Sequence, residues 1–172
     1  MNVLATEFAE AKVVVPAVFH DERGFFKEVY ARDRYAAAGI EDQWLQDNLS
    51  SSRKNVLRGL HFDFRMAKLV QCVRGEIFDV IVDVRAGSAT YGRWQGFRLS
   101  ADNHHQLYVP RGFAHGFLAL CDDVLVHYKQ SAQYDPGCER ALAWNDPTVG
   151  VVWPVSGEPL LSVKDAAAPR LS

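Results

Sequence analysis

The sequence of 172 residues is poor in cysteine, has no marked excess of either charge and contains no long apolar run. Its three cysteines are odd in number and have no C-x-x-C spacing, unlike those of disulfide scaffolds and zinc sites. Nineteen Lys and Arg residues against 21 Asp and Glu give a net charge of −2, which argues against binding nucleic acid or a membrane surface through a basic field. No apolar run approaches the length that spans a bilayer. An anionic ligand must therefore be bound by a local cluster of cations.

What the sequence does contain is enough apolar material for a folded core. Hydrophobic residues make up 48% of the chain and aromatic residues 12%, which excludes a disordered protein. The length suits a single domain, which we predict over residues 1–172 with a frayed end over about 166–172. The N-terminal stretch lacks the basic and apolar regions of a secretion signal, so we expect a cytoplasmic protein.

Most of the chain is predicted to form short β-strands. Runs rich in β-branched and aromatic residues recur between glycine-containing turns, at the spacing of an all-β sandwich or barrel. In the run 77–84 the even-numbered residues are all apolar and are predicted to pack between two sheets. The odd-numbered residues include two aspartates and suit a barrel interior that holds a polar ligand. The best helix candidate is Asp33–Ala38, with Asp33 as N-cap and Gly39 beyond its end.

Polar residues inside apolar strand patterns mark the candidate functional site, because an unpaired polar group is expensive to bury. Four regions stand out: those around Arg58 and His61, around His115, around Tyr128 and at 164–165. Each residue alone is more often structural than catalytic, since core histidines, sheet tyrosines and solvated ion pairs are common. Their joint occurrence favours a site.

A P-x-G-x-x-H segment that ends at His115 is similar to the second sequence motif of cupins. In metal-binding cupins the first motif supplies two histidines and a glutamate. Here Asp63 replaces the second histidine after His61, and Lys68 stands about where the glutamate is expected. An ammonium brings positive charge to a position where a metal needs a ligand, so we expect no metal site, although His61, Asp63 and His115 are possible ligands by type.

With Lys68 in the place of a metal, the same residues suit acid–base chemistry. A fixed ammonium stabilises an oxyanion, and a histidine such as His61 is a natural general base near neutral pH. Asp165 is suited to orient that imidazole, and Tyr128 to supply a proton from another direction. These groups fit removal of a proton α to a carbonyl and its return to the opposite face, an epimerisation through an enolate that requires no cofactor.

The sequence also resembles the dTDP-4-dehydrorhamnose 3,5-epimerase family over nearly its whole length. The order and approximate spacing of the motifs fit: D-x-R-G-x-F-x-E (21–28), Q-D-N-x-S (46–50), V-L-R-G-L-H (56–61), K-L-V (68–70), G-F-A-H-G-F (112–117), Y-K (128–129), W-N-D (144–146) and L-S-x-K-D (161–165). The resemblance implies a cupin-type double-stranded β-helix, or jelly roll, that assembles as a homodimer. It implies inversion of C3 and C5 of a dTDP-4-keto-6-deoxy-D-glucose-type sugar, giving dTDP-4-keto-L-rhamnose.

Roles for individual residues follow from the resemblance. His61 would be the base, paired with Asp165, Tyr128 the proton donor, and Lys68 the group that holds the C4 oxygen. Substrate contacts, some of them from a neighbouring subunit, are implied for Arg23, Glu28, Gln46, Asn48, Arg58, His115, Glu139 and Lys164. The cations expected to converge on the diphosphate and the enolate are Arg23, Arg58, Lys68 and Lys164.

One segment departs from the family pattern. The stretch 62–67 between His61 and Lys68 looks shorter than in the usual members, which leaves open the sugar, the nucleotide and whether both centres are inverted. The alternatives are a 3- or 5-epimerase or an epimerase of another nucleotide-linked 4-keto sugar, a metal-dependent cupin enzyme, and a non-catalytic binding module. For a dimer, the run 13–18 is a candidate to pair with a partner's sheet edge.

Overall fold

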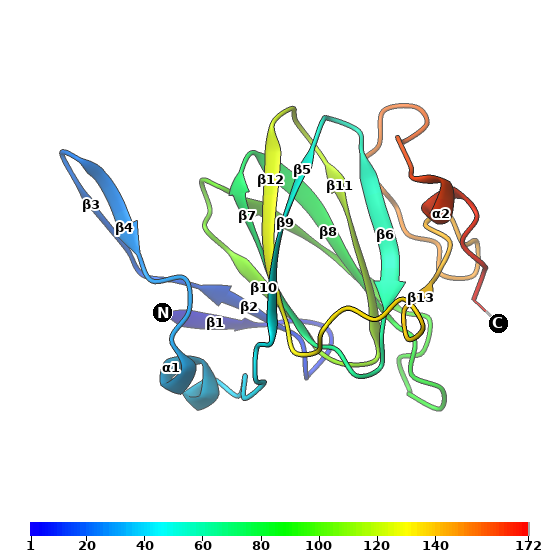
Figure 1. Ribbon diagram of the computed structural model, residues 1–172, viewed down its shortest axis with the longest axis horizontal. Coiled ribbons are helices and arrows are strands. Elements are labelled where there is room, and N and C mark those ends of the chain that lie inside the picture. The colour runs from blue at the N-terminus through cyan, green and yellow to red at the C-terminus, as the bar shows by residue number, and fades with distance from the viewer. Residues whose placement is uncertain (172) are drawn as a thin grey trace.

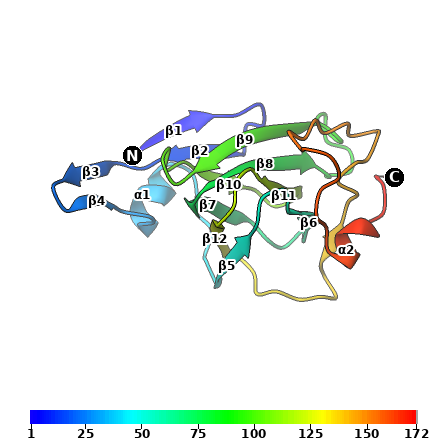
Figure 2. The same ribbon diagram turned by 90° about the horizontal axis from the view of Figure 1, so that it is seen from above.

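The computed structural model describes residues 1–171, and its strands form two facing antiparallel sheets with a separate hairpin (Figures 1 and 2). The first sheet contains, in spatial order, β1 (Asn2–Ala5), β2 (Lys12–Val15), β10 (Gln106–Val109), β7 (Lys68–Arg74), β12 (Val124–Gln130) and β5 (Gln46–Ser52). The second contains β13 (Arg140–Ala141), β6 (Leu57–Phe62), β11 (Phe113–Ala119), β8 (Glu76–Asp83) and β9 (Trp94–Ser100). This confirms the predicted all-β jelly roll with a few short helices.

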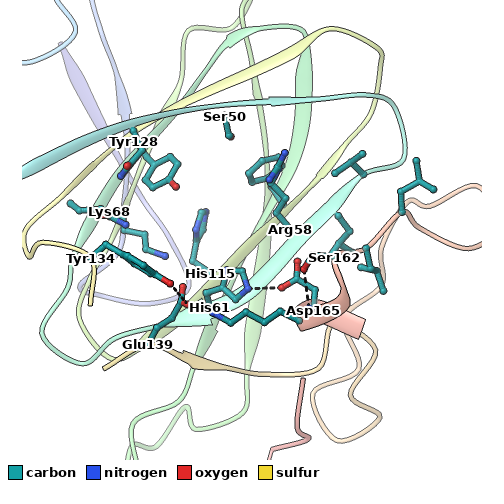
Figure 3. A pocket seen from close by; sticks show the side chains of 18 of the residues that line it. Ser50, Arg58, His61, Lys68, His115, Tyr128, Tyr134, Glu139, Ser162 and Asp165 are labelled. Atoms are coloured by element: carbon teal, nitrogen blue, oxygen red, sulfur yellow. Dashed lines mark hydrogen bonds and ion pairs between the residues drawn. The ribbon is translucent and has the colours of Figure 1, made fainter. Parts of the chain in front are cut away.

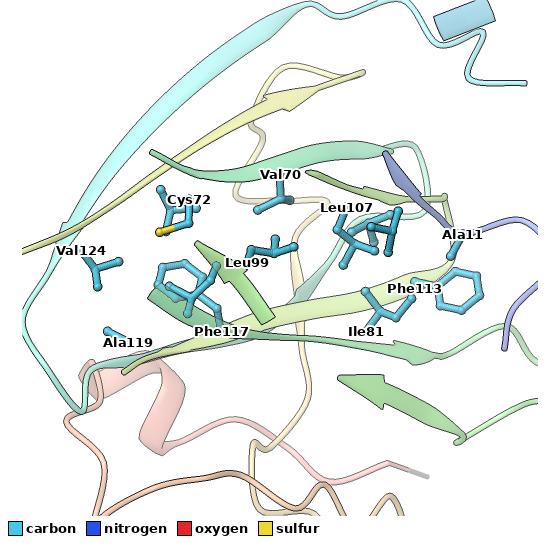
Figure 4. Close-up of a cluster of buried hydrophobic side chains, with 14 of the residues drawn as sticks. Ala11, Val70, Cys72, Ile81, Leu99, Leu107, Phe113, Phe117, Ala119 and Val124 are labelled. Atoms are coloured by element: carbon cyan, nitrogen blue, oxygen red, sulfur yellow. The ribbon is translucent and has the colours of Figure 1, made fainter. Parts of the chain in front are cut away.

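Apolar side chains from both sheets fill the space between them (Figure 4). Ile81 of β8, Val70 of β7 and Leu107 of β10 all belong to this cluster and are fully buried. The mixed, odd-numbered face of β8 therefore lies toward the interior, as predicted. The prediction for the other face was wrong, because Val80 and Val82 pack outside the sandwich.

The C-terminal segment covers the outer face of the second sheet. Val80 and Val82 pack there with Trp153, so this sheet is apolar on both sides. The end predicted to be frayed is attached as far as Leu171: Ala143 N donates to the carbonyl of residue 169 at 2.7 Å, and Leu171 N to the Asp146 carboxylate at 2.6 Å. Position 172 lies outside the described residues.

The helices are short and differ slightly from the prediction. Helix α1 (Arg32–Ala37) begins one residue before Asp33, and its N-cap is Ala31. Gly39 follows its end with φ of +76°, the left-handed conformation that glycine adopts most easily, as predicted. Helix α2 (Val163–Ala166) lies beside β6. Neither helix of the described chain is long and apolar enough to cross a membrane.

The hairpin of β3 (Val18–Asp21) and β4 (Gly24–Lys27) projects away from the two sheets (Figure 1). It leaves Phe19, Phe25 and Phe26 largely exposed. The run 13–18, suggested for pairing with a partner, is divided: β2 lies between β1 and β10 of its own chain, and residue 18 begins the hairpin. That suggestion was therefore wrong for β2.

Asp83, at the end of β8, is a buried carboxylate that we expect to stabilise the second sheet. It is fully buried, and its carboxylate accepts hydrogen bonds from Arg85, Ser88 and Thr90 at 2.6 to 2.9 Å. Burial alone would raise its pKa, but these hydrogen bonds outweigh it and lower the pKa. Its contribution to stability is therefore present above the unfolded pKa, near pH 4, and is lost as the pH falls.

We expect Asp83→Ala to lower the free energy of unfolding by about 3 kcal/mol, because it leaves buried donors unpaired. Urea unfolding at neutral pH measures this loss. Asp21→Ala is the matched control, since Asp21 pairs with Arg23 on the exposed hairpin and its removal should leave the unfolding midpoint unchanged. Equal midpoints for the two variants would contradict the role of Asp83.

Candidate active site

A cavity of about 730 Å³ opens between β5, β7 and β12 of the first sheet and β6, β11 and α2 on the other side (Figure 3). Ten of the twelve predicted catalytic and binding residues line it: His61, Lys68, Tyr128, Asp165, Gln46, Asn48, Arg58, His115, Glu139 and Lys164. Arg23 and Glu28 do not. The structure thus brings distant motifs of the sequence together in one polar cavity.

His61 reaches the cavity because β6 and β11 approach closely. A Cβ atom on Gly59 would lie 2.6 Å from Gly116 Cα, and one on Gly116 would lie 2.6 Å from the Arg58 carbonyl oxygen. Only glycine fits at both places. The approach places His61 directly opposite His115 in the register of the two strands.

Asp165 orients the His61 ring. His61 Nε2 and Asp165 Oδ1 are 2.6 Å apart, and the Asp165 side chain is only 4% exposed. The carboxyl is delivered by α2, where Ser162 Oγ caps the helix by accepting from Asp165 N at 3.1 Å. Burial opposes ionisation of Asp165, but hydrogen bonds from His61, Ser162 and the Gly59 backbone lower its pKa overall. Nδ1 of His61 is the ring nitrogen that this pair leaves for a substrate.

His115 is held by Asp79, a partner that the sequence did not indicate. His115 Nε2 lies 2.9 and 3.0 Å from the two carboxylate oxygens of Asp79, which is fully buried on β8. Burial lowers the pKa of His115, and the nearby cation of Lys68 adds to this, although Asp79 opposes both. His115 is therefore a fixed, mostly buried part of the cavity floor.

Lys68 begins β7 and points into the cavity (Figure 3). Burial lowers the pKa of its ammonium to about 8, while the carboxylates of Glu139, Asp79 and Asp63 act in the opposite direction. No hydrogen bond or ion pair within residues 1–171 engages its Nζ atom. The ammonium is thus a desolvated charge that is available to an oxyanion.

Tyr128 faces the cavity from β12, in the sheet opposite His61 (Figure 3). Burial raises the pKa of its hydroxyl. The charge of Arg58 opposes this increase, and the charge of Glu139 adds to it. The phenol therefore remains protonated at neutral pH and can donate. A base and a proton donor on opposite walls are what inversion of a carbon centre requires.

The predicted cluster of four cations is only partly formed. Arg58 donates to Ser52 Oγ at 3.0 Å and to the Ser51 carbonyl at 2.8 Å, and it has no carboxylate partner in the described chain. Lys164, by contrast, pairs with Glu139, which also accepts from Tyr134 at 3.3 Å. Arg58 and Lys68 are thus the predicted cations left free for a dianionic ligand.

Arg23 and Glu28 lie outside this cavity. Arg23 pairs with Asp21 near the tip of the projecting hairpin, and Glu28 pairs with Arg34 of α1. Neither residue lines the cavity that contains His61 and Asp165, and Glu28 lines a separate cavity of about 270 Å³ beside Phe19 and Arg34. Both residues belong to the D-x-R-G-x-F-x-E motif at 21–28. The sequence shows this motif, but where it lies in space depends on the direction of the hairpin.

Several lining residues were missed. They are Ser50, Arg53, Phe117, Gln130, Tyr134, Leu160, Leu161 and Ser162, with Leu57 at the start of β6 and Val56 just before it. The period of two along a strand was a usable signal for Ser50, which follows Asn48, and for Gln130, which follows Tyr128. Tyr134 lies in a loop, where no such period applies.

The metal-ligand set considered from the sequence is not assembled. The Asp63 carboxylate is bound by Arg65 at 2.7 Å, so it is engaged away from His61 and His115. Residues 1–171 contain no group of three or more His, Cys, Asp and Glu side chains arranged to hold a metal.

The sequence profile of the dTDP-4-dehydrorhamnose 3,5-epimerase family matches residues 5–172. The chain belongs to this family. A family member from Salmonella typhimurium, a dTDP-4-dehydrorhamnose 3,5-epimerase, is 47% identical over 175 aligned residues, which cover 99% of this chain and 96% of the relative. The resemblance drawn from the motifs is confirmed.

Solved structures of this epimerase family have the same fold. The dTDP-6-deoxy-D-glucose-3,5-epimerase of Legionella pneumophila, in complex with dTDP-4-keto-L-rhamnose, is 43% identical with a TM-score of 0.96, covering 99% of this chain and 92% of that one. The dTDP-4-dehydrorhamnose 3,5-epimerase of Bacillus anthracis, with TDP and pyrophosphate bound, is 42% identical with a TM-score of 0.95, covering 99% of both chains. The short stretch 62–67 therefore leaves the family fold unchanged.

Proposed function

We propose that this epimerase converts dTDP-4-keto-6-deoxy-D-glucose into dTDP-4-keto-L-rhamnose, with His61, Lys68, Tyr128 and Asp165 as its catalytic residues. Relatives that match nearly the whole chain are 3,5-epimerases, which favours inversion of two centres over one. The observation that carries the catalytic assignment is the pairing of His61 with Asp165 across the cavity from Tyr128, with Lys68 pointing between them. We also propose that residues 1–172 act as one catalytic domain.

The first step is removal of a proton next to the C4 ketone. Nδ1 of His61 takes the proton from C3 or C5, and the Asp165 carboxylate stabilises the imidazolium that forms. The electron pair moves onto the C4 oxygen, where the ammonium of Lys68 stabilises the resulting enolate. The ketone acidifies both neighbouring carbons, so the chemistry draws on no cofactor.

The second step returns a proton to the other face. Tyr128 donates its phenolic proton to the same carbon from the opposite wall, which inverts the centre. Solvent exchange then returns Tyr128 and His61 to their starting protonation states. Because C3 and C5 flank the same ketone, one base serves both centres after the sugar turns within the cavity.

Arg58 and the hairpin complete the substrate site in this proposal. Arg58 binds the diphosphate, since its guanidinium has no acidic partner in the described chain and lines the cavity. Arg23 and Glu28 reach the nucleotide of a second subunit, which makes the protein a homodimer. The exposed Phe19, Phe25 and Phe26 of the hairpin support this, because large exposed apolar side chains commonly mark an interface.

A product analysis tests the proposed function. The protein is incubated with dTDP-4-keto-6-deoxy-D-glucose, the ketone is reduced with borohydride, and the released sugars are identified. We expect L-rhamnose and 6-deoxy-L-talose, the two reduction products of a sugar inverted at C3 and C5. Sugars inverted at one centre alone would establish a single-centre epimerase, and unchanged 6-deoxy-D sugars would refute the substrate assignment.

The activity is expected to fall at alkaline pH. Lys68 stabilises the enolate only when protonated, and burial lowers its pKa to about 8, so kcat/KM should decline as the pH rises through that value. This alkaline limb of the pH profile is measured from the rates of epimerisation between neutral and alkaline pH. In Lys68→Arg the guanidinium stays protonated, so whatever activity remains should lack the limb. The same decline in both proteins would contradict the assignment to Lys68.

A further inference from the structure

The wall of the cavity opposite His61 carries polar side chains in regular rows. In the register of β5, β12 and β7, Gln130 lies directly opposite Gln46 on one side and Lys68 on the other. Tyr128 is two residues before Gln130, so it projects from the same face of β12. Gln130 is therefore a direct neighbour of both the proposed oxyanion cation and the proposed proton donor, and it lines the cavity with them.

Gln130 has an unused acceptor. Its side chain is 7% exposed, and its Oε1 atom is buried without a hydrogen-bond partner in the part of the chain that the structure describes. The neighbouring Gln46 is different: its Nε2 donates to Asn48 Oδ1 at 2.9 Å, and its Oε1 accepts from Tyr134 N at 2.8 Å. Leaving a buried acceptor unpaired is costly, which suggests that a ligand supplies the missing donor.

We propose that Gln130 is a specificity-determining residue whose Oε1 accepts a hydrogen bond from the C3 hydroxyl of the sugar. The inference rests on the proposed function, which places the C4 oxygen at Lys68. Of the two carbons next to C4, C5 bears the ring oxygen and a methyl group and offers no donor. C3 bears a hydroxyl, which is the donor beside Lys68 that Gln130 lacks.

This contact makes the site selective for sugars that carry oxygen at C3. A site built to hydrogen-bond a hydroxyl binds the analogue without it poorly, because its own polar group is left unpaired. The contact also fixes C3, one of the two reacting carbons, relative to Lys68 and Tyr128. The nucleotide is not involved, since Gln130 lies among the residues that surround the reacting part of the sugar.

The test compares three non-reacting ligands by calorimetry: dTDP, dTDP-6-deoxy-D-glucose and dTDP-3,6-dideoxy-D-glucose. The variant Gln130→Met keeps the length of the side chain and removes the acceptor. We expect it to bind dTDP-6-deoxy-D-glucose about tenfold more weakly than the unaltered protein does, from the loss of one hydrogen bond. Its affinities for dTDP and for the 3-deoxy ligand should be unchanged.

Gln95→Met is the matched control, because Gln95 is half-buried on β9 and its Oε1 accepts from Glu7 N outside the cavity. It should bind all three ligands normally. Gln130→Asn, which withdraws the amide by one carbon, gives a second variant with the same expected pattern if Gln130→Met does not fold. Unchanged binding of all three ligands by a folded variant would overturn the inference, because Oε1 would then be paired only with water.

An equal loss for all three ligands would also overturn it, since the role of Gln130 would then be structural. Failure of the proposed function would look different. In that case the unaltered protein would fail to epimerise dTDP-4-keto-6-deoxy-D-glucose, independently of any result for Gln130.

Discussion

Replacing His61 with asparagine is expected to slow proton exchange at C3 and C5 by about 10² to 10⁴-fold, the usual contribution of a general base. The 2.6 Å contact between His61 Nε2 and Asp165 Oδ1 holds the His61 ring at the cavity. Asparagine preserves a polar group of similar size but cannot take up a proton. Exchange into the sugar is measured by NMR in D₂O, and dTDP affinity should be unchanged.

The chain offers a close control for this variant. His127 on β12 also lies near a carboxylate, with Nε2 3.6 Å from Asp47, but it is not among the residues that line the cavity. His127→Asn should exchange at the normal rate. If His61→Asn also kept the normal rate while dTDP still bound, His61 would not be the base, and a non-catalytic binding module would become the better account.

Replacing Lys68 with methionine is expected to lower kcat by about 10² to 10³-fold, the usual effect of removing one group that stabilises an oxyanion. Methionine fills the same space without a charge. Because burial lowers the pKa of Lys68 to about 8, the folded protein bears the cost of desolvating this ammonium. Thermal unfolding of the variant should therefore occur at the same temperature or higher.

That combination separates a catalytic lysine from a structural one. Lys129→Met is the control, since Lys129 pairs with Asp47 at 2.9 Å on the outer side of β12. It should leave kcat unchanged. A Lys68→Met protein that is fully active, or one that loses activity only because it unfolds at a much lower temperature, would contradict the proposed role of Lys68.

The sequence predicted the strands and most of the candidate site because both depend on local patterns, namely the alternation of side chains along a strand and short motifs. The alternation in β8 placed Asp79 on the interior face, and the motifs around His61, His115 and Tyr128 gave residues that the fold brings to one cavity. The partner of His115 was not predictable in this way. The contact with Asp79 depends on how β8 and β11 are paired, which no local pattern contains.

The differences between the sequence predictions and the structure have physical causes of the same kind. The apolar face of β8 was assigned to the space between the sheets, because nothing local showed that the C-terminal segment would cover the outer face. Lys164 was expected to converge on the diphosphate, and it does line the cavity, but the sequence did not show that the loop before β13 pairs it with Glu139. The direction of the hairpin keeps Arg23 from the cavity of its own chain, so its substrate contact stays a prediction that requires a neighbouring subunit.

The central claim is that one base, His61, serves both centres through an enolate at C4. Its most direct test is the NMR spectrum of dTDP-4-keto-6-deoxy-D-glucose incubated with the protein in D₂O. We predict that the signals of the C3 and C5 protons both disappear as deuterium replaces them, and that both persist with His61→Asn. Exchange at one carbon alone, or exchange at either carbon that continues in His61→Asn, would contradict the claim.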